Sequence, residues 1–478
     1  MIGIISLKNV IVIGGGLAGL SSAVALAEAG LRVRLLEKKP HLGGRAASYV
    51  LPGGEHVDNC QHVTLGCCTN LEDFYRRVGA ANQIRFFDRL LFAAPDGQRG
   101  AIGSVALPPP LHMAPSFVFF PLLGWKDKRC IAQALLTIAR SGGHPADLSS
   151  DGAGENVTML AWLQKHRQTV RAIRRFWEVI LVSALDEELG RIDARYGIDV
   201  FWKAFLSTRG GYCVGIPRVP LGELYEGCRK ALAAQGGEVQ LRAGVRGFLI
   251  VDGRVEGVER EDGSMETADY YLAAVPQDVL PELLPTEVVE SEPVFLNLRN
   301  LTASPITGVH LWFDRTVMTE PFLTLLDSTT QWVFNKTHLY GVAEGSGQYL
   351  QLVISASYSL ASRPRQEIIA QCLKELRNVL PVTREATLLK GTVVKEMSAT
   401  FSPVPGSDRW RPSQKSPLSG LFLAGDWTST GWPSTMEGAV RSGYLAAEAI
   451  LSDAGMPRKL LQPDLRAEGF ARLWASAS

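Results

Sequence analysis

The stretch Asn9–Gly19, which reads NVIVIGGGLAG, decides the fold of this chain. Its first part, NVIVI, is short and rich in β-branched residues, as in a buried strand of a parallel sheet. The glycine run GGGLAG follows at once, and the Ala- and Leu-rich stretch Leu20–Ala29 then predicts a helix. A second apolar run, Arg32–Leu36, ends in Glu37. Strand, GxGxxG loop, helix, strand and acidic residue in this order predict the first unit of a Rossmann-like, dinucleotide-binding domain.

Each glycine of this loop has a separate physical task. Gly14 permits the tight turn, Gly16 lets the backbone approach a pyrophosphate, and Gly19 lets the helix pack close to the strand. The helix N-terminus offers unpaired N–H groups and a partial positive charge to the phosphates. Glu37 can accept hydrogen bonds from a ribose. We therefore expect the cofactor to contact the loop, the first helical residues and the acidic strand end, namely Gly14, Gly16, Leu17, Ala18, Gly19, Glu37 and Lys38.

A second glycine motif follows the acidic residue. Leu42-Gly43-Gly44-Arg45 resembles the GGR signature of the large FAD family that includes amine oxidases, phytoene desaturases and protoporphyrinogen oxidases. The resemblance implies that the cofactor is FAD, and that Gly43, Gly44 and Arg45 lie beside its diphosphate.

The C-terminal part of the chain carries a matching motif. The run GLFLAGD ends in Gly425 and Asp426 and resembles the C-terminal flavin motif of the same family, in which the aspartate binds the ribityl or pyrophosphate part. The Gly- and Ala-rich stretch after it suits a helix that starts against the flavin ring and stabilises the reduced flavin with its N–H groups. Within the resemblance, cofactor contacts are also expected from Met436, Gly438, Ala439 and, in a third segment, Val245.

These motifs imply a chain that passes several times between two domains. We expect an α/β protein in which a Rossmann-like FAD-binding domain is interleaved with an α+β substrate domain. The FAD-binding domain is predicted at residues 1–70, 211–290 and 415–455, the substrate domain at 71–210 and 291–414, and a C-terminal tail at 456–478. A second GxGxxG unit is missing, which argues against a built-in NAD(P)H domain.

Composition narrows the class of protein. Hydrophobic residues make up 46% and charged residues 20%, which fits a large core, and the net charge of +1 gives no reason to expect nucleic acid. Seven scattered cysteines without a CxxC pair suggest reduced thiols in a cytoplasmic protein, and we expect no metal site. No stretch reaches about 18 uninterrupted apolar residues, so a spanning helix is not expected.

The loop Asp58-Asn59-Cys60-Gln61-His62 carries the most information about the reaction. Together with the run GDWTSTGWPSTMEGAVRSG near the C-terminus, it resembles the squalene-associated flavoproteins, the hydroxysqualene dehydroxylases of hopanoid biosynthesis. One departure is Cys60, which stands where glycine is usual. The resemblance implies a hydrophobic C30 isoprenoid substrate and reductive dehydroxylation of hydroxysqualene to squalene.

That reaction needs an acid to protonate the leaving hydroxyl. The ionisable candidates near the expected flavin are Asp58, His62 and Glu437, each of which also has a purely structural interpretation. Side chains expected to face the substrate or the flavin are Cys60, Gln61, Trp427, Trp432 and Pro433.

Three alternatives stay open at this point. A carotenoid or phytoene-type desaturase or isomerase would run hydride transfer in the other direction. A non-catalytic prenyl-lipid-binding protein of the same fold, like the Rab escort and GDP-dissociation-inhibitor proteins, would bind lipid without flavin chemistry. An oxidase of polar amines would need aromatic-cage residues, for which Tyr444 alone is poor support. The electron donor is not evident from the sequence.

An apolar, proline-interrupted segment at residues 105–125 predicts contact with a membrane surface. It carries several aromatic residues, ends in Trp125, and is followed by Lys126, Lys128 and Arg129. Aromatic rings suit the membrane interface, and basic residues suit anionic headgroups. We therefore expect a cytoplasmic protein that is peripherally associated with a membrane.

Overall fold

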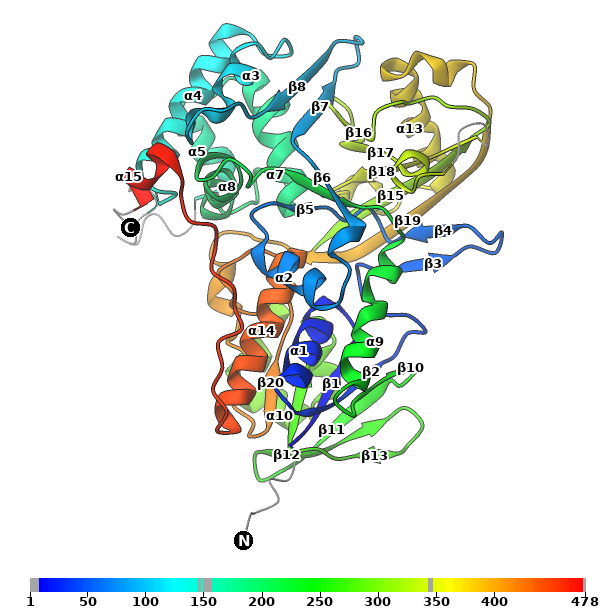
Figure 1. Ribbon diagram of the computed structural model, residues 1–478, viewed down its shortest axis with the longest axis vertical. Helices are drawn as coiled ribbons and strands as arrows, with labels where there is room; N and C mark the ends of the chain where they lie inside the picture. Colours follow the sequence, from blue (N-terminus) through cyan, green and yellow to red (C-terminus); the bar gives the residue numbers. More distant parts are fainter. Residues whose placement is uncertain (1–7, 145–147, 149–156, 343–346, 476–478) are drawn as a thin grey trace.

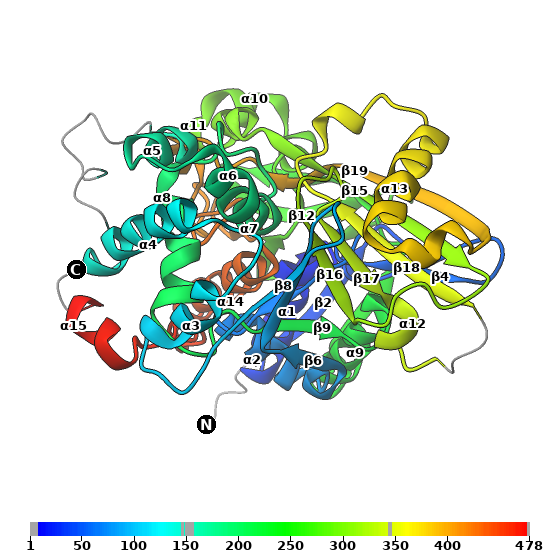
Figure 2. The same cartoon turned by 90° about the horizontal axis from the view of Figure 1, so that it is seen from above.

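The computed structural model describes residues 8–144, 148, 157–342 and 347–475. Two large sheets organise the chain, one in the lower and one in the upper half of Figure 1. The chain crosses between the two halves repeatedly, and helices cover both sheets (Figures 1 and 2). The expected α/β class is confirmed.

The lower half is built on a five-stranded parallel sheet. The order of its strands is β10 (Glu238–Leu241), β2 (Arg32–Glu37), β1 (Asn9–Ile13), β14 (Tyr270–Ala273) and β20 (Leu421–Leu423). The central strand β1 is buried on both faces, which explains its unbroken apolar sequence. Val10 and Val12 pack toward the helices, whereas Ile11 and Ile13 pack toward a second, three-stranded sheet.

Three helices cover one face of this sheet: α1 (Leu17–Glu28), α9 (Glu226–Ala233) and α14 (Met436–Asp453). Helix α1 packs against α14 at very short range. A Cβ on Gly443 would lie 2.2 Å from Ser21 Oγ and 2.4 Å from the Ala18 carbonyl oxygen, so only glycine fits there. The opposite face is covered by β11 (Val245–Val251), β12 (Arg254–Arg260) and β13 (Met265–Glu266).

The upper half is built on a seven-stranded mixed sheet. Its order is β19 (Leu388–Phe401), β15 (Ala303–Phe313), β18 (Gln348–Ile354), β17 (Trp332–Asn335), β16 (Phe322–Leu325), β7 (Arg89–Ala93) and β8 (Arg99–Gly103). Helix α13 (Arg365–Val379) covers one face of this sheet. The other face packs against a helical group that includes α4 (Trp125–Arg140), α7 (Glu178–Leu185), α8 (Ala194–Val200) and the π-helix η5 (Phe201–Leu206).

All strands of the five-stranded sheet lie within residues 1–70, 211–290 and 415–455, and all strands of the seven-stranded sheet lie within residues 71–210 and 291–414. Helix α2 (Thr69–Arg77) begins before residue 71 and packs on α14, because Leu71 and Phe74 belong to the core beneath the five-stranded sheet. Residues 293–301 also pack in the lower half, where Phe295 and Leu298 share a core with the three-stranded sheet. Neither position carries a local sequence signal that assigns it to one domain.

The C-terminal segment lies along the surface and is held by specific bonds. The N–H groups of Leu460 and Leu461 donate to Glu448 at 2.7 and 2.8 Å, and Asp464 accepts from Arg441 at 2.7 Å. The segment ends in the short helix α15 (Arg472–Ala475) beside the upper half (Figure 1).

The apolar segment 105–125 is divided between surface and core. It forms η2 (Leu111–Met113) and α3 (Ala114–Val118) and ends at the start of α4. Phe119 and Trp125 are 83% and 73% exposed, whereas Phe120, Leu122 and Leu123 are buried. Phe120, Leu122 and Leu123 therefore belong to the core of the upper half, where Phe120 packs edge-on against Phe92 of β7. In the described ranges, no helix has the length and apolar character needed to cross a membrane.

Candidate active site

The glycine loop after β1 has one open side. A Cβ on Gly14 would lie 2.4 Å from the Ala274 carbonyl oxygen, and one on Gly19 would lie 2.0 Å from the Gly14 carbonyl oxygen. Beside Gly16, by contrast, nothing lies closer to such a Cβ than Gly44 Cα at 3.8 Å. The two glycine motifs thus pack on each other and leave room at Gly16 for a group that approaches the first turn of α1. This geometry fits a diphosphate, whose oxygens the free N–H groups of that turn can bind.

The acidic residue at the end of β2 is tied to the same loop. Glu37 is buried and accepts hydrogen bonds from the Gly15 N–H at 2.6 Å and the Lys39 N–H at 2.7 Å. Lys38 instead points outward and pairs with Glu261 at 2.9 Å on the surface. The predicted cofactor contact of Lys38 therefore does not extend to its ammonium group. Val245 opens β11 and packs against the core next to this strand end.

Arg45 and Asp426, predicted from opposite ends of the chain, form an ion pair. Arg45 also donates to the Ala399 carbonyl oxygen at 2.7 Å, and Ser434 donates to Asp426. The backbone N–H of Gly425, which precedes the aspartate, donates to Ser442 Oγ on α14 at 2.9 Å. The two sequence motifs are thus brought into a single polar cluster at the carboxyl ends of the parallel strands, where ligands bind in open α/β sheets.

Helix α14 begins at this cluster. Thr435 caps it by accepting from the Gly438 N–H at 3.0 Å, and Met436 and Ala439 lie in its first turn, partly buried. The partial positive charge of this helix N-terminus faces the region between the two halves.

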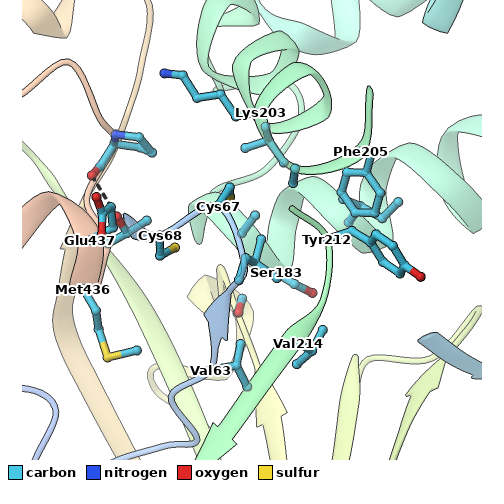
Figure 3. A pocket seen from close by; sticks show the side chains of 18 of the residues that line it. Val63, Cys67, Cys68, Ser183, Lys203, Phe205, Tyr212, Val214, Met436 and Glu437 are labelled. Carbon is cyan, nitrogen blue, oxygen red and sulfur yellow. Dashed lines mark hydrogen bonds between the residues drawn. The ribbon is translucent and has the colours of Figure 1, made fainter. Parts of the chain in front are cut away.

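Above the helix start lies an elongated, mainly apolar pocket between the two halves of the molecule. Its empty space is about 1350 Å³, including the open mouth. Figure 3 shows Met436 and Glu437 at the start of α14 on the left with Cys68 beside them, Cys67 and Val63 in the middle, Lys203 at the top, and Phe205 and Tyr212 on the right. Strands β17 and β18 contribute Trp332, Phe334 and Val353. The part of this space that a water-sized molecule can reach is about 210 Å³. Its wall is mainly hydrocarbon, as in pockets that bind apolar ligands.

Asp58 is not available as a proton donor. It is buried at the end of β4 (His56–Asp58), and its carboxylate accepts from Lys336 at 2.8 Å, Tyr340 at 3.0 Å and Ser48 at 2.6 Å. Burial alone would raise the pKa of Asp58, but Lys336 and the other donors outweigh this effect and hold the pKa below its usual value. The acid predicted at this position is instead a charged group that fixes the loop.

The rest of the Asp58–His62 loop has a distinct role for each residue. Gln61 lines the pocket, and its Oε1 accepts from Lys336 at 2.8 Å. His62 lies next to it with Nδ1 3.4 Å from the Cys60 carbonyl oxygen, and burial lowers the pKa of His62, which favours the neutral ring. Cys60 has a φ of 62°, in the left-handed region that favours glycine. The glycine usual at this position is thus explained, and the Cys60 thiol packs against Gly308 instead of lining the pocket.

Glu437 also has structural partners. Its carboxylate accepts from Leu71 N–H at 2.8 Å and from the Asn70 amide at 2.8 Å, so it caps the first turn of α2. Burial raises the pKa of Glu437, although these donors and Arg441 oppose the shift. Glu437 lines the pocket, but its oxygens are directed to the helix that they cap.

The three residues expected to face substrate or flavin near the C-terminus separate into two groups. Trp432 and Pro433 line the pocket. Trp427 does not: it is fully buried and donates from Nε1 to the Val275 carbonyl oxygen at 2.9 Å. The prediction for Trp427 is therefore wrong, because its ring packs into the core beneath β14 and β20.

Lys336 and Tyr340 are the important residues that the sequence did not reveal. Both follow β17, and both bind Asp58 from the upper half. Burial lowers the pKa of Lys336, opposed by Asp58. A lysine after a strand normally lies in solvent, so no local signal distinguishes this one.

Comparison with known proteins agrees with this geometry. Residues 17–451 match the family described as flavin containing amine oxidoreductase. A 15-cis-phytoene desaturase of Solanum lycopersicum is 28% identical over 93% of this chain and 78% of its own length. The 15-cis-phytoene desaturase of Synechococcus elongatus is 26% identical over 93% of this chain and 96% of its own length. A zeta-carotene desaturase of Zea mays is 28% identical over 95% of this chain and 86% of its own length.

Solved structures share the fold at low sequence identity. An oxidoreductase of Methanosarcina mazei has a TM-score of 0.72 at 18% identity and covers 93% of this chain and 100% of its own. Putrescine oxidase bound to putrescine has a TM-score of 0.71 at 16% identity, and the match covers 93% of this chain and 99% of the oxidase chain. The family match, the glycine loops and the Arg45–Asp426 cluster lead to one conclusion: the chain belongs to the flavin containing amine oxidoreductase family and is an FAD-dependent oxidoreductase.

Proposed function

We propose that this enzyme carries out a redox reaction on a long isoprenoid chain, and that desaturation of a carotenoid precursor is its principal candidate reaction. The observation that carries the proposal is the elongated apolar pocket that opens beside the start of α14. The relatives support it, since those described above are phytoene and zeta-carotene desaturases. An oxidase of small polar amines is less well supported, because the pocket wall is mainly hydrocarbon.

The protein groups divide the work between cofactor and substrate. Bound FAD supplies the hydride-transfer chemistry. The Gly16 side of the loop and the first turn of α1 suit its diphosphate, and Arg45 with Asp426 suits the adjoining polar part. Gln61, Trp432 and Met436 line the pocket between this region and the upper half, where they orient the apolar chain and exclude water.

Reductive dehydroxylation of hydroxysqualene to squalene is the second candidate. It is favoured by the sequence of the Asp58–His62 loop and of residues 425–443, which resemble the squalene-associated flavoproteins. With Asp58 bound to Lys336 and Glu437 capping α2, His62 is the remaining candidate of the three beside the flavin, and its neutral ring would orient the leaving hydroxyl by a hydrogen bond.

Two assays separate these candidates. The reduced protein is incubated anaerobically with hydroxysqualene, and the oxidised protein with phytoene and an artificial electron acceptor. Mass analysis shows whether the product has lost oxygen or two hydrogens. Dehydrogenated phytoene supports the principal candidate, squalene supports the second, and no product from either refutes the proposed substrate class. In the active assay, His62→Ala is expected to slow turnover by about 10²–10⁴-fold with little loss of FAD.

We also propose that the protein works at a membrane surface, on its cytoplasmic side. Phe119 is exposed at the end of α3 and Trp125 at the start of α4, two helices in the upper part of Figure 1. Lys128 lies 5.0 Å from the Trp125 ring centroid. Exposed aromatic rings beside basic residues suit an interface with anionic lipids. A hydrocarbon substrate dissolved in the bilayer gives such an enzyme a reason to dock there.

A further inference from the structure

His310 and Gln351 lie side by side on the sheet face that contributes to the pocket. His310 of β15 pairs with Gln351 of β18, and Gln351 pairs in turn with Phe334 of β17. Because alternate residues of a strand share a face, Gln351 lies on the same face as Val353 two residues further on. Phe334 and Val353 both line the pocket. His310 and Gln351 therefore lie on the same face of the sheet as Phe334 and Val353, next to the apolar wall of the pocket.

Both side chains carry polar atoms that have no partner. His310 and Gln351 are fully buried, and neither His310 Nε2 nor either polar atom of the Gln351 amide makes a hydrogen bond to any part of the chain described here. Buried amide and imidazole groups are nearly always hydrogen-bonded, so three such atoms in adjacent side chains indicate a missing polar partner. The same face is covered by the loop at Cys60, whose Sγ lies against Gly308, the preceding position of β15 on this face.

The chemistry of the pair defines that partner. The hydroxyl oxygen of Tyr349 lies 2.7 Å from His310 Nδ1. Burial raises the pKa of Tyr349, so its hydroxyl keeps its proton and donates a hydrogen bond to Nδ1. The imidazole proton is then on Nε2, which becomes a donor. Burial also lowers the pKa of His310 to about 3, so the ring is neutral. A neutral N–H donor next to an amide that can donate and accept complements a hydroxyl group, which itself accepts and donates.

We propose that His310 and Gln351, which adjoin Phe334 and Val353 of the pocket wall without lining the open space, form a polar subsite that receives the hydroxyl group of an isoprenoid alcohol. This inference rests on the second candidate of the proposed function, reductive dehydroxylation, because phytoene, the substrate assayed for the principal candidate, carries no hydroxyl group. The charged groups near His310 are Asp58 and Lys336, which are paired with each other. They therefore leave a neutral site, and an alcohol suits it better than an ammonium or a carboxylate does.

The test compares two ligands with one carbon skeleton, squalene and hydroxysqualene. Their binding to the oxidised, FAD-loaded enzyme is measured by the change in the flavin spectrum, so that no turnover occurs. We expect the wild type to bind the alcohol at least about 10-fold more tightly than the hydrocarbon, since a site built to bind a hydroxyl rejects an analogue without one. His310→Phe and Gln351→Leu should each remove this preference while binding squalene as well as before.

Two controls keep the outcome decisive. His310→Gln places an amide donor near the position of Nε2 and should restore part of the preference. Thr392→Val removes a hydroxyl from the register partner of His310 on the other side of β15, and should leave the preference intact. Equal binding of the two ligands by the wild type, or a preference that survives in both His310→Phe and Gln351→Leu, overturns the inference, because the pair then holds only an internal water. If squalene, hydroxysqualene and phytoene all fail to bind, the proposed function itself fails.

Discussion

Arg45 and Asp426 form an ion pair across 381 positions of sequence, and this pair joins the two halves of the flavin motif. Neither motif alone encloses the cofactor region. Arg45 reaches across to the Ala399 carbonyl oxygen on β19, so the pair also connects the lower half to the long strand of the upper half. The polar cluster is therefore a junction of three segments that are distant in sequence.

Gly16→Val is expected to yield folded protein without FAD. The nearest protein atom to a Cβ added at Gly16 is Gly44 Cα at 3.8 Å, an ordinary van der Waals contact, so the added side chain would occupy the region that fits the diphosphate. The measurement is the ratio of flavin absorbance to protein absorbance, with circular dichroism as the check on folding. Gly190→Ala is a matched control, because a Cβ there meets only Leu160 Cδ2 at 3.9 Å, and this variant should keep its flavin. A fully yellow Gly16→Val protein would show that the diphosphate lies elsewhere.

We expect the Cys60→Gly variant to be more stable than the Cys60→Ala variant. Cys60→Ala and Cys60→Gly both remove the thiol, but only alanine retains a Cβ at a φ of 62°. A left-handed conformation costs a residue with a Cβ roughly 1–2 kcal/mol, which exceeds the usual advantage of alanine over glycine. In urea unfolding, the free energy of unfolding of Cys60→Gly should therefore exceed that of Cys60→Ala by about 1 kcal/mol. The opposite order would mean that the loop does not hold this conformation in solution.

Lys336→Met should destabilise the protein strongly and change the way stability depends on pH. Breaking a buried ion pair by removing one partner costs about 3–5 kcal/mol. Lys8→Met is the matched control: Lys8 and Asp269 are 2.9 Å apart, close to the 2.8 Å between Lys336 and Asp58, but they lie at the surface, where such a pair is worth about 0–1 kcal/mol.

The pH effect of this change has a definite sign. In the wild type the pKa of Asp58 is lowered on folding, so its contribution to stability is present above its unfolded pKa of about 3.9 and is lost as the pH falls through the folded value. Without Lys336, burial raises the pKa of Asp58 instead, and stability is then lost as the pH rises through that raised value. Thermal unfolding midpoints at pH 5 and pH 8 should show Lys336→Met recovering part of its loss at the lower pH. A loss of the same size at both values would argue against a charged Asp58.

For membrane contact, surface and core residues of one segment should behave differently. The double variant Phe119→Ser and Trp125→Ser changes exposed side chains and should release the protein from anionic liposomes while leaving it folded and yellow. The double variant Phe120→Ser and Leu123→Ser changes buried side chains of the same segment and should aggregate or unfold. Co-sedimentation measures the first effect, and soluble yield measures the second. A wild-type protein that stays in the supernatant with such liposomes contradicts the membrane proposal.

The sequence was most informative where the chemistry is local. The turn at Gly14, the close packing at Gly19 and the acid at Glu37 follow from a contiguous unit, and the structure places them in one loop. The resemblance placed Arg45 and Asp426 beside the same cofactor, and the structure adds the ion pair between them, which no local pattern contains.

Where a side chain's role depends on a partner from another segment, the sequence misled. Asp58 is a residue type that can act as an acid catalyst, but its carboxylate is paired with Lys336, which lies 278 positions away in the sequence. Trp427 stands next to a flavin motif residue, yet its ring turns into the core to reach Val275. Phe119 and Phe120 are residues of the same type, so hydropathy does not separate them, and Phe120 is buried because it packs against Phe92 of β7.

The strand order of the five-stranded sheet has a consequence for how the protein is made. The first strand, β1, leaves the ribosome early, but its neighbour β14 follows only at Tyr270 and the edge strand β20 only at Leu421. Long-range parallel pairings form slowly, because the intervening chain must be ordered before they contribute. During most of synthesis the apolar strand β1 therefore has β2 as its only adjacent partner, and its other edge waits for β14. A nascent chain in this state presents an unpaired hydrophobic edge, so chaperone supply and growth temperature are expected to limit the yield of this protein in a foreign host.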